Sequence, residues 1–175
     1  MCYGVCGSGK TTLAKRIGER TGLPWHSADD LAWLPGWKET SLEFQTEKIG
    51  EIVSQEEWVL DTAYGKWIDL PMSRVELIVA LDYPRWFSFA RLLRRTFARA
   101  IDKKPICNGN VETWKTTFSR KSILVWHFQS FSRKRERIRK WQADPKGPAV
   151  VAFRNPRAAE KWLLSLQPGC GVVKY

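Results

Sequence analysis

Residues 4–12 read Gly4-Val5-Cys6-Gly7-Ser8-Gly9-Lys10-Thr11-Thr12 and decide the fold class of this chain. They fit the phosphate-binding loop pattern G-x-x-x-x-G-K-[ST], a glycine-rich turn that follows a buried strand and opens a helix. Glycines let the backbone curl so that successive N–H groups point at phosphate oxygens, and the positive helix N-terminus adds to the attraction. The stretch therefore predicts an α/β domain with a nucleoside triphosphate site. A glycine-rich turn that merely opens a helix is the alternative.

The residue types of the loop assign expected roles. Lys10 is the candidate catalytic cation, because a lysine here reaches the β- and γ-phosphates, and the Thr11 hydroxyl is the expected Mg²⁺ ligand. After the loop, Leu13 and Ile17 share one helical face and Gly22 ends the pattern, so a helix follows. The residues expected to bind ATP are Gly4, Cys6, Gly7, Ser8, Gly9, Lys10, Thr11 and Thr12.

Only Met1, Cys2 and Tyr3 precede the loop, whereas a strand averages about five or six residues. We therefore expect most of the first strand to be missing, as in a fragment or a chain with an internal start. The alternative is a three-residue strand that still pairs.

Length and composition favour one cytoplasmic domain over residues 1–175. No run of 18 apolar residues and no signal segment occurs, so no membrane contact is expected. The four cysteines form no C-x-x-C pair and are expected to be free thiols. Oligomeric state stays open.

Positive charge is concentrated in residues 85–140, where 16 Lys and Arg face three acids, for a net +13 in a chain of net +11. Such a block either contacts nucleic acid or lines a pocket for anionic nucleotides. The sequence leaves both interpretations open.

Two regions supply candidate carboxylates. Asp29 lies in the tryptophan-rich segment 27–37, expected to be a contact loop, and is the candidate catalytic acid; capping a short turn is its alternative. Residues 58–61 predict a buried strand that delivers Asp61 to the ligand-binding edge of the sheet, where it is the candidate Mg²⁺ residue. An Asp61 that only bonds its own turn is the other interpretation.

Residues 75–82 are the most apolar strand, expected in the middle of the sheet. The following helix, 85–101, carries an apolar stripe (Phe89, Leu93, Phe97) and a basic stripe (Arg91, Arg95, Arg99). No acid on the helix balances the arginines, so Arg91 and Arg95 are candidate catalytic residues on an anion; a solvated face is the alternative.

A lid is expected at about 99–122, where periodicity is weak and turn residues gather. A helix over 119–141 should then turn its apolar residues inward and its basic residues outward. The inward set is Leu124, Phe128, Phe131 and Ile138, and the outward set is Arg133, Lys134, Arg135, Arg137, Arg139 and Lys140. A last strand, 149–153, precedes a helix capped by Asn155.

Four motifs occur in order: the phosphate loop, D-x-x-x-W-x-P-x-W from Asp29, D-x-x-Y from Asp61, and D-x-P-R from Asp82. Together the chain resembles the adenylate-kinase-like P-loop proteins often labelled topology modulation proteins, relatives of adenylate and shikimate kinases. The resemblance implies a P-loop NTPase three-layer sandwich with a parallel five-stranded sheet and a helical lid bearing arginines. It also implies ATP, Mg²⁺ and an acceptor pocket over the second and third strands.

Carried over by position, the resemblance assigns Asp29 to the acceptor region, Asp61 to the end of the third strand, and Arg91 and Arg95 to the helix entering the lid. The Asp-Gly-Phe-Pro-Arg motif of adenylate kinases is absent, which argues against AMP as acceptor. The leading hypothesis is an ATP-dependent phosphotransferase acting on a small acceptor. The alternative is a nucleic-acid-associated ATPase or nucleotide-binding switch using the basic block.

Overall fold

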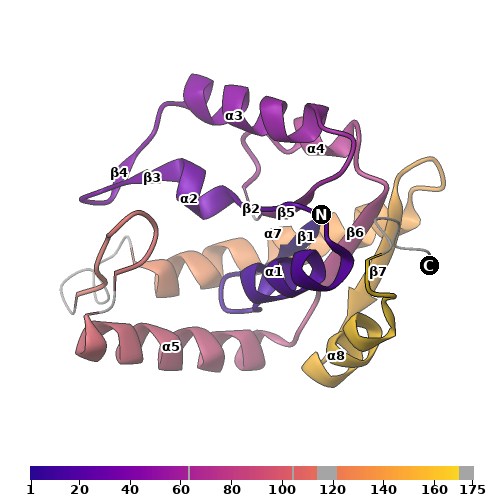
Figure 1. Cartoon of the computed structure of the whole chain (residues 1–175). Coiled ribbons are helices and arrows are strands. Elements are labelled where there is room, and N and C mark those ends of the chain that lie inside the picture. The colour runs from indigo at the N-terminus through magenta and orange to yellow at the C-terminus, as the bar shows by residue number, and fades with distance from the viewer. Residues whose placement is uncertain (63, 104, 114–121, 170–175) are drawn as a thin grey trace.

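The computed structural model describes residues 1–62, 64–103, 105–113 and 122–169, and forms a three-layer α/β sandwich (Figure 1). A five-stranded parallel sheet has the order β2-β5-β1-β6-β7. Its strands are β1 Cys2–Gly4, β2 Trp25–Ser27, β5 Val59–Thr62, β6 Leu77–Leu81 and β7 Ala149–Phe153, and a separate hairpin joins β3 Trp33–Leu34 to β4 Lys38–Glu39. The helices are α1 Lys10–Thr21, α2 Ala28–Ala32, α3 Leu42–Ser54, α4 Asp69–Met72, α5 Arg85–Asp102, α7 Ile123–Ala143 and α8 Pro156–Ser165. The predicted fold class is confirmed.

The centre of the sheet is the three-residue strand β1. Cys2 pairs with Asp61 of β5 on one side and with Val79 of β6 on the other, so a strand this short still pairs along both edges. The strand expected in the middle of the sheet at 75–82 is β6, an interior strand that pairs with β1 on one edge and β7 on the other, while β1 holds the central position. A strand rich in apolar residues is expected to have both faces buried, but its composition does not indicate which strands it pairs with.

Helices bury both faces of the sheet. On one face, α1 and α8 pack against alternate strand residues, including Cys2 and Val79. On the other face, Tyr3, Ile78 and Ala80 pack against Ile138 of α7. Two helix signals read from the sequence are confirmed: Gly22 ends α1 with φ 84°, and the Asn155 side chain accepts the capping N–H bond of α8. The Ser41 side chain caps α3 in the same way.

Helix α5 buries a different stripe from the one expected. Its buried residues are Ser88, Leu92, Thr96 and Ala100, whereas Phe89, Leu93 and Phe97 are half-buried at its flanks. A Cβ placed on Gly7 would lie 2.4 Å from the Ser88 carbonyl oxygen, so the phosphate loop touches the backbone of this helix. Because the loop approaches the α5 backbone this closely, aromatic side chains do not fit on the face of α5 that contacts the loop.

Helix α7 begins at Ile123, with Ser122 as its N-cap, and Phe131 and Ile138 face inward as predicted. Two other expectations for this helix are wrong: Phe128 is 48% exposed, and Lys134 is 4% exposed. The buried side chains His127, Phe131, Lys134 and Ile138 recur every three or four residues, so they share one helical face. Six basic residues lie between positions 133 and 140, so the sequence does not reveal which of them falls on the buried face. No helix in the described ranges has the length and apolar character needed to cross a membrane.

Candidate nucleotide and acceptor site

The carboxyl ends of β1, β2 and β5 meet at one edge of the sheet. Asp61 pairs in register with Ser27 of β2 and with Cys2 of β1. The phosphate loop, the start of α2 and the Asp61 carboxylate therefore gather at the edge where open parallel sheets bind ligands.

The phosphate loop is held open by its glycines. Gly7 and Gly9 have φ of 81° and 94°, in the left-handed region that side chains disfavour. A Cβ on Gly4 would lie 2.7 Å from the Ser8 hydroxyl oxygen. That hydroxyl is buried and has no hydrogen-bond partner among the described residues. The loop thus has the close backbone approach and the spare polar atom that a phosphate cradle requires.

Lys10 is buried directly behind the loop, at 9% exposure. Burial by itself lowers the pKa of its ammonium group, but Cys6, Asp29 and Asp61 act in the opposite direction and the net pKa is raised. Lys10 is therefore a cation at neutral pH, held between the loop and two carboxylates.

Asp61 and Thr11 offer oxygen ligands beside the loop. The Ala28 backbone N–H donates to Asp61 Oδ1 over 3.1 Å. Burial raises the pKa of Asp61, and Lys10 and a hydrogen bond with Thr11 oppose that rise. The described residues contain no cluster of three or more His, Cys, Asp or Glu side chains suited to a metal. A hydroxyl with one carboxylate suits Mg²⁺, which keeps waters and takes its other oxygens from substrate phosphates.

Asp29 points into the site and Asp30 points away. The Tyr64 hydroxyl donates to Asp29 Oδ1 over 2.9 Å, and Trp33 Nε1 donates to the Tyr64 oxygen over 3.0 Å. Asp30 is exposed. The expected contact loop is in fact helix α2 followed by the β3–β4 hairpin, so both acids lie in the first turn of a helix. Tyr64 is a site residue that was not among the predicted ones, and the D-x-x-Y spacing from Asp61 is the sequence signal that identifies it.

The arginines of α5 divide among three environments. The Arg95 Nε atom is buried without a partner in the described chain, and burial, then Arg99, lowers the pKa of Arg95. Arg91 lies against the loop, since a Cβ on Gly9 would be 3.1 Å from Arg91 Nη2. Arg99 instead forms an ion pair of 3.2 Å with Glu112. The structure therefore brings Arg91 and Arg95 to the loop and gives Arg99 a protein partner.

Lys134 of α7 is the cation that the sequence analysis missed. Burial lowers its pKa to about 8; Cys6 and Asp29 act to raise it, and Lys10 and Arg133 act to lower it. Its side chain is 4% exposed and lies on the buried face of α7, whereas the sequence predicted that it would face solvent.

Residues 105–113 dock on the acceptor side of the site. Asn108 Nδ2 donates to the carbonyl oxygens of Asp30 and Trp33 over 2.7 and 2.8 Å. Asn110 accepts from the Trp37 backbone N–H over 2.6 Å. Figure 1 shows this segment rising from the end of α5 to the β3–β4 hairpin. Of the lid expected at 99–122, residues 99–102 belong to α5, and residues 104 and 114–121 lie outside the described residues.

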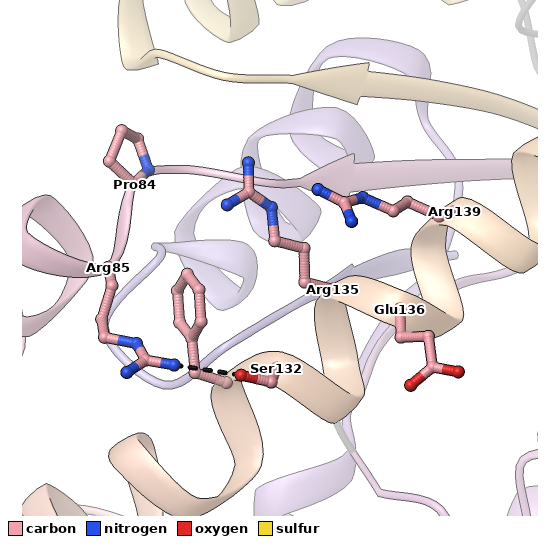
Figure 2. Close-up of a pocket in the computed structure, with 7 residues that line it drawn as sticks. Pro84, Arg85, Ser132, Arg135, Glu136 and Arg139 are labelled. Atoms are coloured by element: carbon pink, nitrogen blue, oxygen red, sulfur yellow. Dashed lines mark hydrogen bonds between the residues drawn. The ribbon is translucent and has the colours of Figure 1, made fainter.

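A second, basic cleft of about 630 Å³ lies between the start of α5 and the middle of α7 (Figure 2). Two of its arginines have protein partners: Arg85 donates to Ser132 Oγ over 3.0 Å, and Arg135 pairs with Asp82 at 3.0 Å. None of the sequence-predicted site residues lines it; the lining residues are Pro84, Arg85, Phe131, Ser132, Arg135, Glu136 and Arg139. The cleft is distinct from the phosphate loop.

Comparison with known proteins places the architecture among kinases of P-loop fold. No protein-family model matches the chain, and no curated protein matches it. An unliganded sugar kinase from Janibacter sp. HTCC2649 superposes with a TM-score of 0.53 and 15% identity, over 99% of this chain and 96% of that one. A gluconokinase from Sinorhizobium meliloti 1021 gives 0.52 and 17% identity, over 93% and 89%. At these identities the similarity establishes the fold. The chain has the P-loop kinase fold.

Proposed function

We propose that this protein is an ATP-dependent phosphotransferase that acts on a small hydroxyl-bearing acceptor. The observation that carries the proposal is the convergence of the phosphate loop, Lys10, Arg95 and Asp29 at one sheet edge. The phosphate loop would bind the triphosphate of the donor. Asp29, which lies apart from the loop, would bind the acceptor. The motif resemblance to adenylate-kinase-like proteins supports the same conclusion.

Cations around the phosphate loop would neutralise the negative charge of the ATP phosphates. Lys10, Arg91 and Arg95 come from two elements and surround the place where the terminal phosphoryl group would lie. Phosphoryl transfer spreads charge over the equatorial oxygens, so positioned cations stabilise the transition state more than the ground state. Thr11 and Asp61 would hold Mg²⁺, which neutralises phosphate charge when bound. The remaining contribution of the protein is positioning.

Asp29 acts on the acceptor. Its Oδ1 is fixed by the Tyr64 hydroxyl, so its other carboxylate oxygen is left to accept the proton of a substrate hydroxyl. The acceptor oxygen then forms a bond to the γ-phosphorus while the bond to the β,γ-bridging oxygen breaks, giving ADP and a phosphomonoester. Asp29 takes the proton of the acceptor hydroxyl and ADP leaves with the bridging oxygen, so the transfer needs no further reactant.

Aromatic side chains gather beside Asp29: Trp33 and Tyr64 are linked to it by hydrogen bonds, and Trp67 packs behind Tyr64 in the core. Trp33 and Trp37 contact edge to face at 5.9 Å, and Tyr64 stacks on Trp67 at 5.6 Å. Rings beside a carboxylate suit a small polyhydroxylated molecule, whose C–H faces pack on them while a hydroxyl meets the acid. The two solved structures of similar fold, a sugar kinase and a gluconokinase, support this acceptor class.

The test is incubation of the protein with labelled ATP and Mg²⁺ against a panel of sugars, sugar acids and other small alcohols. Transfer of label to one of them is expected, and Lys10→Ala should abolish it while the protein stays folded. Label released only as inorganic phosphate under every condition would contradict the proposal.

A second candidate function rests on the outer surface of α7. Trp126 and Phe128 are 46% and 48% exposed, and the Arg133 guanidinium lies 5.6 Å from the Trp126 ring. Exposed rings interleaved with arginines suit the stacking of single-stranded bases. A nucleic-acid-associated ATPase would show ATP hydrolysis stimulated by single-stranded DNA or RNA, with no transfer to small acceptors. The panel experiment separates the two functions.

A further inference from the structure

Lys134 is a buried cation for which the described residues supply no hydrogen-bond or ion-pair partner. It is 4% exposed, in the middle of the inward face of α7 between Phe131 and Ile138. No hydrogen bond or ion pair joins its ammonium group to any residue that the structure describes. Moving an ammonium group out of water is unfavourable unless another group compensates its charge. The buried position of Lys134 and the unfavourable free energy of burying its charge together indicate that this side chain binds an anion.

The neighbours of Lys134 show where that anion would lie. On the same buried face of α7, His127 Nε2 lies 2.9 Å from Ser88 Oγ of α5, and the Ser88 carbonyl oxygen would lie 2.4 Å from a Cβ on Gly7 of the phosphate loop. One turn beyond Lys134, Ile138 packs with Tyr3, the residue that precedes the loop. Lys134 lies between these two contacts, and the effects of Cys6 and Asp29 on the pKa of Lys134 agree with this position. Lys10 belongs to α1, Arg95 to α5 and Lys134 to α7. Three cations on three helices therefore converge on one space, bounded by the loop on one side and the acceptor acid on the other.

Three cations in one space repel each other unless a polyanion joins them. Lys10 lowers the pKa of Lys134, and Arg95 acts to lower that of Lys10, which is the expected effect of like charges on each other. Asp29 and Asp61 lie beside these cations, but two carboxylates compensate only part of the charge of three cations. Because the space lies between loop and acceptor acid, the group that fits there is the end of a phosphate chain nearest the acceptor.

We propose that Lys134 binds the terminal, transferable phosphate of the nucleotide from the side opposite the phosphate loop. The inference rests on the proposed function and adds a residue to it. A lysine acts as a compact point charge without the planar fork of arginine, so it attracts the three equatorial oxygens without requiring one orientation. Lys134 would therefore distinguish ATP from ADP, because only ATP places a phosphate in this position.

The basic cleft of Figure 2 is not the target of Lys134. Arg135 and Arg139 line that cleft, and they project from α7 on a different face from the buried stripe that holds Lys134. Arg135 is also compensated by Asp82. The charge of Lys134 is thus directed inward to the phosphate loop and is separate from the outer arginines.

The test compares Lys134→Met with Lys140→Met, which makes the same chemical change at an exposed position of the same helix. Affinity for MgATP and MgADP is measured by titration calorimetry, and the unfolding midpoint of the free protein by thermal denaturation. Lys134→Met should weaken MgATP binding about 10- to 100-fold and MgADP binding less than about threefold. Its free form should unfold at the same or a higher temperature, since an uncompensated buried charge is removed. Lys140→Met should leave both affinities unchanged.

The ratio of ATP to ADP affinity decides the outcome. If Lys134→Met keeps the wild-type ratio, the proposal for Lys134 is wrong while the proposed function stands. If the wild-type protein binds neither nucleotide, the proposed function and this inference both fail. Lys134→Arg provides the charge-preserving comparison and should retain most of the wild-type preference for ATP, including if the methionine variant folds poorly.

Discussion

The Tyr64 hydroxyl donates a hydrogen bond to Asp29 Oδ1 over 2.9 Å, across 35 residues of sequence. The same hydroxyl accepts from Trp33 Nε1, so the acid is fixed by a relay from the β3–β4 hairpin through the end of β5. Burial raises the pKa of Tyr64, with Asp29 adding to the rise, so this hydroxyl stays protonated at every physiological pH. A permanent donor leaves Asp29 one free oxygen in a constant orientation.

Tyr64→Phe removes the donor and keeps the ring. We expect turnover with the acceptor to fall about tenfold, because Asp29 loses its fixed orientation, and ATP affinity to stay near wild type. The unpaired Trp33 N–H should cost about 1–3 kcal/mol of stability. Steady-state kinetics with thermal unfolding measure both effects. Trp33→Phe is the comparison: it removes the N–H that bonds Tyr64 but keeps the bond from Tyr64 to Asp29 and an aromatic ring, so turnover should fall less than in Tyr64→Phe.

The two adjacent acids should behave oppositely. Asp29→Asn should reduce phosphoryl transfer by about 10²–10⁴-fold, the usual contribution of a general base, without altering ATP affinity. Asp30→Asn should change little, because its side chain is exposed. Single-turnover transfer assays on both variants provide the comparison. A critical Asp30 with a dispensable Asp29 would contradict the assignment of the acceptor side.

Arg95 and Arg94 are neighbours on α5 with different surroundings. The Arg95 Nε atom is buried and has no hydrogen-bond partner among the described residues, whereas the Arg94 side chain is exposed. Arg95→Ala should lower turnover by about 10³-fold, the lower range for arginines that stabilise phosphoryl transfer, and affect ATP affinity far less. Arg94→Ala serves as the matched control and should retain activity. Equal rates in the two variants would mean that the α5 stripe is a solvated face.

Gly7 should tolerate no side chain. Its φ is 81°, and an added Cβ would lie 2.4 Å from the Ser88 carbonyl oxygen and 2.8 Å from Leu92 Cβ. Gly7→Ala should destabilise the protein by about 1–3 kcal/mol through strain, and should separate the loop from α5. Gly50→Ala, in α3 with open space around it, should instead stabilise by about 0.5–1 kcal/mol. Chemical denaturation of both variants tests the contrast.

Lys134 gives a pH dependence with a definite sign. Its pKa is lowered to about 8 from 10.5, so between these values the unfolded chain binds more protons than the folded one. Stability contributed by this residue therefore increases as pH rises from about 8 to about 10.5, and below about 8 the charged lysine is destabilising. The stability advantage of Lys134→Met over wild type should be largest at pH 7 and should shrink above pH 8. Denaturation of both proteins across this pH range measures the difference. An advantage independent of pH would contradict a buried, uncompensated ammonium group.

Much of the fold was predictable because its signals are local. The loop glycines, the Asn155 cap and the strand expected at 58–61 depend on residues close together in the sequence; the structure has the cap as expected and the strand at Val59–Thr62. The strand order was not predictable in the same way. Pairing of Cys2 with both Asp61 and Val79 depends on crossover connections, and the apolar content of β6 carries no information about them.

The sequence by itself determined a phosphate-binding loop and its helix, because close backbone approach and positive φ require glycines at fixed spacing. Only the tertiary structure decided which charged side chains reach that loop. In the sequence, Lys134 cannot be told apart from the basic residues around it that face outward, yet its side chain lies on the buried face of α7. Tyr64 contacts Asp29 only because β2 and β5 pair. Such contacts depend on how helices and strands pack, and packing brings together residues that the sequence places far apart.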